Sequence, residues 1–370
     1  RDLHVRSRRQ RQMCIRDRKK SPENKYIPMP PPNITGKLHM GHGLFLTIQD
    51  SLIRYWKNSS HKALWLPGLD HAGLATHEKI LKYKKKKKID YSLAAKHIEK
   101  SHKEIILNQI KQIGALPDWS KISYTLNYDQ LIYDILKLML SQGRIYQKDR
   151  QIYLNLKDYA QKLLEDLKDG LFDINPSHEI KNLLPFLENF EDWNISRQIP
   201  WGTNLPFSIE GNELIFKENP KESLDTWFNS SLWPIAILNQ DPKLFKEFYP
   251  ASILETGGDI LFFWCARMLI MSSFCYDHQK ELSLELNSRY CFKKIYLHGI
   301  IRDNQGRKFS KSLGNGIDPL DMIKKYGPDA TRLFLITRSG PGEDIILDEA
   351  ELITCLLYTS PSPRDAHESR

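Results

Sequence analysis

Two histidines three residues apart, His39 and His42, stand where a predicted strand gives way to a predicted helix. The segment reads PPPNITGKLHMGH. The start of a helix presents free backbone N–H groups and the positive end of the helix dipole, so it favours an anion. Histidines placed there can donate hydrogen bonds to phosphate oxygens, and Gly41 leaves room for a base or ribose against the backbone. The alternative is that the two histidines only cap the helix.

A second candidate is the loop segment KFSKS, which carries Lys308 and Lys311 and follows a predicted strand. Two lysines on such a loop suit the neutralisation of charge on a departing pyrophosphate. Taken alone, a segment of this kind is more often a basic surface loop. The same alternative applies to the lysine run Lys84–Lys88, which we predict to be a solvated surface loop.

The spacing of apolar residues predicts strands that alternate with helices, which indicates an α/β fold with a parallel sheet. The predicted strands are Lys25–Pro30, Ala63–Pro67, 252–256 and 294–301. The predicted helices are Gly41–Lys57, Tyr91–Ile113, Tyr128–Gln142, 154–170, one from about Asp259, and two from near Asp318 and Pro328. The helix from Asp259 is apolar, but its length and its charged residues Asp259 and Arg267 predict a buried helix and no membrane partner.

Composition narrows the class of protein. Hydrophobic residues make up 41% of the chain, enough for a buried core, and the net charge of +9 is compatible with nucleic acid without demonstrating it. The cysteines form no C-x-x-C pair, so we predict no zinc site and no disulfide framework, as is typical of a reducing cytoplasm. The cysteines are Cys14, Cys265, Cys275, Cys291 and Cys355.

Both ends of the chain look foreign to the fold. Residues 1–20 are arginine-rich without apolar periodicity, and residues 354–370 interrupt a helical pattern and end in turn residues. We interpret both as sequence artefacts. The alternative for the first is a mitochondrial transit peptide, which would change the predicted location from cytoplasmic to mitochondrial.

In this order and far apart in the chain, HMGH and KFSKS resemble the HIGH and KMSKS signatures of class I aminoacyl-tRNA synthetases. The resemblance extends over residues 25–353. Several blocks look like the valine-specific branch of that family. They are PPPNITGKLHMGH, GLDHAGLATH, ISRQIPWG, DTWFNSSLWP, TGGDILFFWCARM and GRKFSKSLGNGIDPLDMI.

The resemblance implies a Rossmann-like parallel sheet, split by a short insertion, with the active site at the carboxyl ends of its strands. It implies activation of valine by ATP with Mg²⁺, followed by transfer to tRNA(Val), in a monomer that holds no metal through its own side chains. The implied catalytic residues are His39, His42, Lys308 and Lys311. The implied ATP-binding residues are Gly41, Gly257, Asp259, His298, Gly299, Ser310 and Ser312. The implied amino-acid-binding residues are Pro31, Asn33, Asp70, Trp201, Ile260 and Trp264.

Simpler alternatives accompany these roles. Asp70 and Asp259 could cap helices, and Trp201, Ile260 and Trp264 could be ordinary core. The resemblance also leaves two other functions open. One is a paralogue that activates an amino acid for an acceptor other than tRNA, and the other is a tRNA-binding module without catalysis.

The chain departs from the family pattern in its middle. The resemblance divides it into 21–145 and 191–300 as halves of the catalytic domain, 146–190 as a shortened connection, and 301–353 as the KFSKS loop with helices. Residues 146–190 are predicted as helix plus loop and are too few for the family's editing domain. The chain also ends where the family's anticodon-binding domain would begin.

Overall fold

A parallel sheet forms the centre of the protein. The computed structural model describes residues 23–210, 213–308 and 317–359. β1 (Lys25–Pro28) pairs with β2 (Ala63–Leu66), and β15 (Lys294–His298) lies between β14 (Leu254–Gly257) and β7 (Asp173–Asn175), all parallel. β1 lies beside β14, where the N–H of Ser252 donates to the carbonyl oxygen of Tyr26 at 2.9 Å. The spatial order is therefore β2-β1-β14-β15-β7, which confirms the parallel sheet that the sequence predicts.

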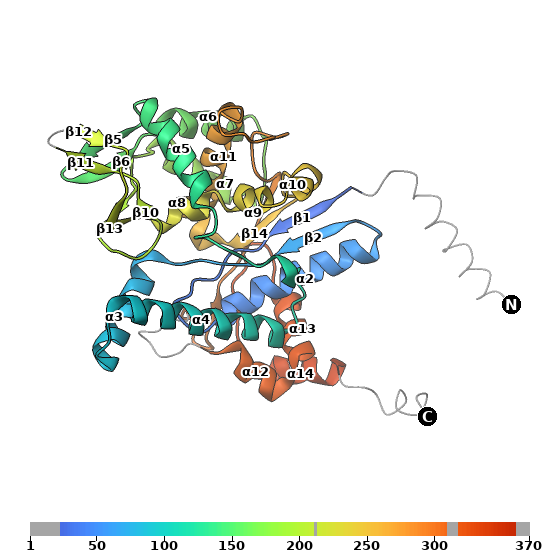
Figure 1. The fold of residues 1–370 in the computed structure, drawn as a ribbon. Helices are drawn as coiled ribbons and strands as arrows, with labels where there is room; N and C mark the ends of the chain where they lie inside the picture. The colour runs from blue at the N-terminus through green and yellow to red at the C-terminus, as the bar shows by residue number, and fades with distance from the viewer. Residues whose placement is uncertain (1–22, 211–212, 309–316, 360–370) are drawn as a thin grey trace.

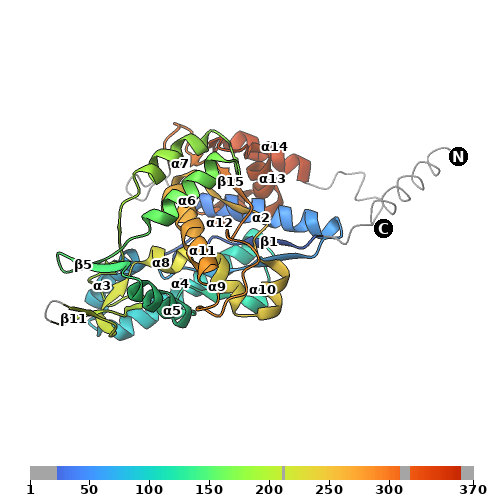
Figure 2. The same ribbon diagram turned by 90° about the horizontal axis from the view of Figure 1, so that it is seen from above.

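Helices cover both faces of this sheet, as Figure 1 shows. One face carries α2 with α4, α12, α13 and α14, and the other carries the group from α6 to α11. Figure 2, seen from above, shows α11 beside α8 and α9. The helices are α2 (Met40–Asn58), α3 (Gly73–Lys87), α4 (Tyr91–Ile113), α5 (Asp129–Ser141), α6 (Lys157–Lys168), α7 (Glu179–Glu188), α8 (Thr226–Ser231), α9 (Trp233–Asn239), α10 (Pro242–Phe248), α11 (Arg267–Asp277), α12 (Pro319–Tyr326), α13 (Pro328–Arg338) and α14 (Glu349–Thr359).

The remaining strands are short and form small sheets outside the central one. β3 (Gly68–Leu69) and β4 (Ser123–Tyr124) are parallel, as are β16 (Ile301–Arg302) and β17 (Ile345–Ile346). The antiparallel pieces are β5 (Ile145–Lys148), β6 (Gln151–Leu154) and β8 (Trp193–Asn194); β9 (Ser196–Arg197), β10 (Asn204–Leu205) and β13 (Asn219–Leu224); and β11 (Ser208–Glu210) with β12 (Glu213–Ile215).

Local signals set the ends of α4 where the sequence predicts them. The Asp90 side chain accepts a hydrogen bond from the N–H of Leu93 at 2.8 Å, which caps the first turn. Gly114 ends the helix with φ +84°, a conformation that glycine adopts without a steric cost. The prediction of a helix over Tyr91–Ile113 is therefore confirmed.

The predicted surface loop at Lys84–Lys88 is wrong. Residues Lys84–Lys87 form the last turn of α3, and only Lys88 lies beyond it, with φ 55°. Lysine has good helix propensity and is favoured near the negative end of the helix dipole. The run therefore extends the helix instead of forming the predicted loop.

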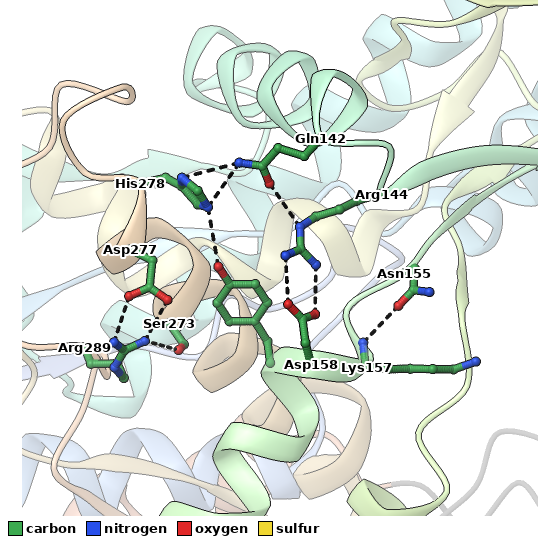
Figure 3. A network of polar contacts seen from close by, with 10 residues as sticks. Gln142, Arg144, Asn155, Lys157, Asp158, Ser273, Asp277, His278 and Arg289 are labelled. Carbon is green, nitrogen blue, oxygen red and sulfur yellow. Dashed lines mark hydrogen bonds and ion pairs between the residues drawn. The ribbon is translucent and has the colours of Figure 1, made fainter.

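Residues 146–190 contain more than the predicted helix and loop. They hold the β5–β6 hairpin, α6, β7 and α7, and β7 pairs with β15 as an edge of the central sheet. Polar contacts join the turn between α5 and β5 to α6 and to the end of α11 (Figure 3). The Arg144 guanidinium donates to both carboxylate oxygens of Asp158 at 2.8 Å, and Gln142 contacts His278 at the end of α11. This region is integral to the packing of the domain.

One helical stretch in the described ranges, Gly258–Asp277, is long and apolar enough to cross a membrane. Of its most apolar window, 67% is buried inside the fold. Length and composition are weak grounds for a membrane span, because the buried core helix of a globular protein meets the same two criteria. The stretch begins as a 3-10 turn, Gly258–Ile260, and a π-helix, Leu261–Ala266, before α11.

Candidate active site

A cavity of about 420 Å³ opens where the central parallel strands end at their carboxyl edge. Its walls come from the segment after β1, the first turn of α2, Asp70 after β3, α8, the turns after β14, and the segment after β15. Segments that are distant in sequence meet there because the carboxyl ends of parallel strands share one edge. The predicted position of the site at this edge agrees with where the cavity lies.

Most of the residues that the sequence singles out line this one cavity. They are Pro31, Asn33, His39, Gly41, His42, Asp70, Gly257, Asp259, Ile260, Trp264, His298, Gly299 and Lys308. Ser310, Lys311 and Ser312 lie outside the described residues. Trp201 lies elsewhere.

Trp201 belongs to the hydrophobic core cluster that includes Leu69 and Tyr124, and it is not among the residues that line the cavity. Its indole N–H donates to the carbonyl oxygen of His71 at 2.9 Å. A buried indole N–H needs an acceptor, and this one finds it on the backbone beside Asp70. Trp201 therefore supports the Asp70 loop from behind, and the tryptophans that line the cavity are Trp227 and Trp264.

The two histidines cap α2 and line the cavity at the same time. Nδ1 of His39 accepts from the N–H of Gly41 at 3.1 Å, and Nδ1 of His42 accepts from the N–H of His39 at 3.2 Å. A ring nitrogen that accepts from an amide carries no hydrogen, so the proton of each neutral ring sits on Nε2. The cap thus fixes the tautomer that offers a donor, and the capping and phosphate-binding interpretations are compatible.

Lys308 reaches across the cavity to the turn after β14. Its Nζ lies 2.9 Å from Oδ2 of Asp259, and both side chains are about half exposed, at 55% and 48%. In the described residues the N-cap positions of the two turns are Gly257 and Ile260, so Asp259 does not occupy the cap position that the alternative gave it. An exposed ion pair contributes little to stability, so a charged ligand can replace either partner.

Asp70 is the most buried acidic side chain that lines the cavity, with 4% exposed. Its backbone pairs with the strand-like segment at Asn33. The N–H of Ile34 donates to the carbonyl oxygen of Asp70 at 2.9 Å, and the N–H of Asp70 donates to the carbonyl oxygen of Pro32 at 2.9 Å. This pairing brings the Asn33 and Asp70 segments together at one end of the cavity.

The Asp70 carboxylate is surrounded by neutral donors. It accepts from the hydroxyl of Thr226 at 2.9 Å, from the hydroxyl of Ser230, and from the N–H of Ala72 at 2.5 Å. No Lys, Arg or His in the described part of the chain forms an ion pair with it. A buried carboxylate is costly without a positive partner. A cationic group on a ligand would supply that partner.

Sequence reasoning missed Thr226, Trp227 and Ser230 of α8. Thr226 and Ser230 are four residues apart, so both hydroxyls lie on one helix face, toward Asp70. That i, i+4 pair of hydroxyls in the block DTWFNSSLWP is the signal that could have found them. Trp264 is held at the same place, since its indole N–H donates to the carbonyl oxygen of Ser230 at 2.9 Å.

Replacing Gly41 by alanine is expected to lower the activity of this site about 10- to 100-fold without loss of stability. The new Cβ would lie 2.9 Å from Cε1 and 3.0 Å from Nδ1 of His39, so the ring must move. A displacement of about 1 Å at a reacting centre can cost about 10² in rate, whereas alanine is the better helix former. Gly43→Ala is the matched control, because its Cβ makes only ordinary contacts, at 3.6 Å to Pro319 and 3.7 Å to Leu335. Equal activity in the two variants would contradict the role of the His39 ring.

The cavity offers no cage for a metal ion. Within the ranges that the structure describes, no group of three or more His, Cys, Asp or Glu side chains could hold one. The acidic side chains that line the cavity are Asp70 and Asp259, and Asp259 is paired with Lys308. Such a site fits a cation that arrives bound to the phosphates of a nucleotide.

Several proteins of known sequence resemble this chain. It is 35% identical over 257 residues to a valine–tRNA ligase of Streptococcus thermophilus, which covers 66% of this chain and 27% of the relative. It is 40% identical over 215 residues to the valine–tRNA ligase of Symbiobacterium thermophilum, and the match covers 53% of this chain and 22% of the relative. It is 24% identical over 532 residues to that of Mycoplasmopsis synoviae, covering 88% and 63%. The chain therefore spans less than two thirds of the length of these relatives.

Solved structures share the fold. The ternary complex of Agrobacterium radiobacter K84 agnB2 LeuRS with tRNA and LeuAMS superposes with a TM-score of 0.74 at 14% identity, covering 92% of this chain and 72% of that one. Mycobacterium tuberculosis methionyl-tRNA synthetase bound by methionyl-adenylate gives a TM-score of 0.69 at 18% identity, covering 90% and 68%. These likenesses confirm the predicted fold class.

A family model settles the membership. The model described as tRNA synthetases class I (I, L, M and V) matches residues 10–157, 145–224 and 211–348. These ranges include the histidine segment, Asp70, α8 and the strands that frame the cavity. By its sequence match and its fold, the chain belongs to the class I aminoacyl-tRNA synthetases.

Proposed function

We propose that this chain is the catalytic core of a valine–tRNA ligase, which activates valine with ATP and transfers it to tRNA(Val). The observation that carries the proposal is Asp70. It is a buried carboxylate without a positive partner in the described chain, and it lines the same cavity as the two histidines at the start of α2. One end of the cavity thus suits an amino acid's ammonium group and the other suits phosphate.

In the proposed first step, a carboxylate oxygen of valine attacks the α-phosphorus of ATP. The bond from that phosphorus to the oxygen bridging to the β-phosphate breaks, which yields valyl-adenylate and pyrophosphate. Nε2–H groups of His39 and His42 donate to phosphate oxygens, while Lys308 and Lys311 balance the charge that gathers on pyrophosphate. Mg²⁺ bound to the phosphates would add to this neutralisation. Phosphoryl transfer of this kind needs positioning and charge balance, and no covalent intermediate with the protein.

The nucleoside would lie between the turns after β14 and β15. Gly257 and Asp259 belong to the first of these segments and His298 and Gly299 to the second, and all four line the cavity. Gly299 must be glycine, because a Cβ there would lie 2.0 Å from the carbonyl oxygen of Glu343. In the second step a hydroxyl of the terminal ribose of tRNA attacks the carbonyl carbon of the adenylate, and AMP leaves.

The proposed choice of valine draws on two observations. The relatives described above are valine–tRNA ligases. The cavity that Asp70 lines also has apolar walls, formed by Pro31, Ile260, Trp227 and Trp264. A small apolar pocket beside a single carboxylate fits a short branched aliphatic amino acid.

The test is isotope exchange between pyrophosphate and ATP, catalysed by the complete chain with Mg²⁺ and one amino acid at a time. Valine is expected to support exchange at least about 10-fold better than isoleucine, whose extra methylene a small pocket disfavours. Leucine and methionine, the other substrates of this family's branches, should support less. Exchange with isoleucine in preference to valine would overturn the choice of valine. A folded chain that exchanges with none of the four would overturn the catalytic proposal.

A further inference from the structure

Behind the cavity, a buried chain of hydrogen bonds runs from α2 and β2 through β14 to His298. The indole Nε1 of Trp65 lies 2.8 Å from Oε1 of Gln49, and Nε2 of Gln49 lies 2.8 Å from Oε2 of Glu255. Oε1 of Glu255 lies 2.5 Å from Nδ1 of His298. Gln49 and Glu255 have no exposed surface, and Trp65 has 2%. None of these groups can exchange its partner for water.

The hydrogen bond from Trp65 to Gln49 sets the direction of those that follow. An indole N–H only donates, so Oε1 of Gln49 must accept and its amide nitrogen must point to Glu255. The amide nitrogen only donates, so Oε2 of Glu255 accepts. Nδ1 of His298 then meets the other oxygen of the same carboxylate, which accepts as well. With Glu255 ionised, both of its oxygens accept, so the hydrogen between Glu255 and His298 belongs to Nδ1 of the ring.

The sheet places the other ring nitrogen at the cavity. Glu255 and Gly257 are two residues apart on β14, so they face the same side, and Gly257 is the register partner of His298 on β15. Nε2 of His298 lies 3.4 Å from the point where a Cβ of Gly257 would stand. With hydrogen on Nδ1, Nε2 of the neutral ring has a lone pair and accepts. His298 thus has the opposite tautomer to His39 and His42.

We propose that Glu255 is a positioning residue that acts through His298. It holds the ring as an acceptor that faces the nucleoside, where it receives a hydrogen bond from a ribose hydroxyl or an amine of the base. The phosphate end of the cavity presents donors from His39 and His42, and the nucleoside end presents this acceptor. The ligand belongs to the proposed function. The hydrogen on Nδ1 rests on the hydrogen bonds to Glu255, and the neutral state of the ring is part of this proposal.

Glu255→Gln tests the proposal, because it replaces one carboxylate oxygen in this chain of hydrogen bonds by an NH₂ group. Gln49 would still donate to the oxygen of the new amide, so the new NH₂ group must face Nδ1 of His298. The ring then has to move its hydrogen to Nε2 and turns from acceptor to donor toward the nucleoside. Residues that support metal-ligating histidines are worth about 10- to 100-fold in affinity or activity. By analogy, we expect the Kd for ATP to rise by about that factor.

The matched control exchanges the two buried side chains, Gln49→Glu with Glu255→Gln. The carboxylate now at position 49 can accept from Trp65 and from the amide nitrogen now at position 255. It gives up one contact of Gln49, whose amide nitrogen also donates to the backbone carbonyl oxygen of Glu255 at 3.1 Å. The amide oxygen at position 255 then accepts again from Nδ1–H of His298. Although both positions are substituted, the double variant should restore the Nδ1–H tautomer of His298. It should also bring the Kd for ATP to within about threefold of the wild-type value. A role that depended only on the shape of residue 255 would not produce this recovery.

Two measurements are made on the complete chain. Ring ¹³C and ¹⁵N NMR shifts, assigned with the His298→Gln variant, report the tautomer in the absence of ligand, and calorimetric titration with ATP and Mg²⁺ reports binding. The expected result is Nδ1–H in the wild type and the double variant, and Nε2–H with weaker ATP binding in Glu255→Gln.

Two results would overturn the proposal: Nε2–H in the wild type, or a folded double variant that stays as weak as the single one. If Glu255→Gln does not fold, the wild type and double variant still decide the matter. A wild-type chain that shows Nδ1–H but does not bind ATP would count against the proposed function and leave the tautomer intact.

Discussion

Replacing Asp70 by asparagine is expected to raise the KM for valine by at least about 30-fold in pyrophosphate exchange, with little change in the Kd for ATP. Losing one partner of a buried, hydrogen-bonded charge pair costs about 2–5 kcal/mol, and each 1.4 kcal/mol is about tenfold. Asparagine preserves the shape of the loop, because its oxygen can accept from Ala72 and Thr226 while its amide group faces the Ser230 hydroxyl. The loss should therefore fall on the amino acid.

Asp166→Asn is the matched control for this experiment. Asp166 is as buried as Asp70, with 4% exposed, and it is paired with Lys162 and Tyr290 away from the cavity. Its replacement should reduce the melting temperature and leave the KM for valine unchanged. Equal rises in the valine KM and the ATP Kd of Asp70→Asn, or no rise in either, would contradict the assignment of Asp70 to the ammonium group.

The second large effect concerns threonine, which is nearly isosteric with valine. The apolar wall of Pro31, Ile260 and Trp264 offers shape but no means to reject a hydroxyl. Valine–tRNA ligases are themselves the known example, in which the pocket prefers valine over threonine by only about 10² and editing supplies the rest. We carry that magnitude over from the relatives, and we expect measurable exchange with threonine at about that disadvantage.

We further hypothesise that this chain does not hydrolyse the mischarged product. Residues 146–190 are occupied by the β5–β6 hairpin, α6, β7 and α7, which pack into the catalytic domain. The alignment to the Mycoplasmopsis synoviae relative runs over 532 residues, more than the 370 of this chain, so the relative carries internal sequence that this chain lacks. These observations motivate the hypothesis that residues 146–190 of this chain hold no editing domain.

The measurement is the deacylation of threonyl-tRNA that carries the valine anticodon, with and without the complete chain. The expected rate equals the spontaneous one, while valyl-tRNA formation and threonine exchange proceed in the same preparation. An editing-competent valine–tRNA ligase is the positive control for the substrate. Rapid hydrolysis that depends on this chain would refute the hypothesis and would require a hydrolytic site elsewhere in it.

The sequence by itself determined the features that depend on neighbours within about four residues. The bounds of α4 follow from Asp90 and Gly114, and the cap of α2 follows from two histidines at the start of an apolar helical pattern. Such features are fixed by hydrogen bonds and dihedral preferences inside one short segment. The same local rules, applied without weight on helix propensity, gave the wrong structure for Lys84–Lys87.

Resemblance of the sequence to a family extended this reach to residues far apart. It singled out Asp70, Asp259, His298 and Lys308 together, and the structure brings all four to one cavity. Periodicity alone does not contain that information, because the order of strands in a sheet is decided by contacts between segments and not within them. The placement of β7 at the edge of the central sheet is of the same kind.

Only the tertiary structure decided which way individual side chains turn. Trp201 faces the core because its N–H finds the carbonyl oxygen of His71, whereas Trp264 lines the cavity while its N–H binds the carbonyl oxygen of Ser230. The tautomer of His298 depends on Trp65 through two intervening side chains. Each choice is set by which buried donor lies within reach of which acceptor, and that distance exists only after the segments have packed.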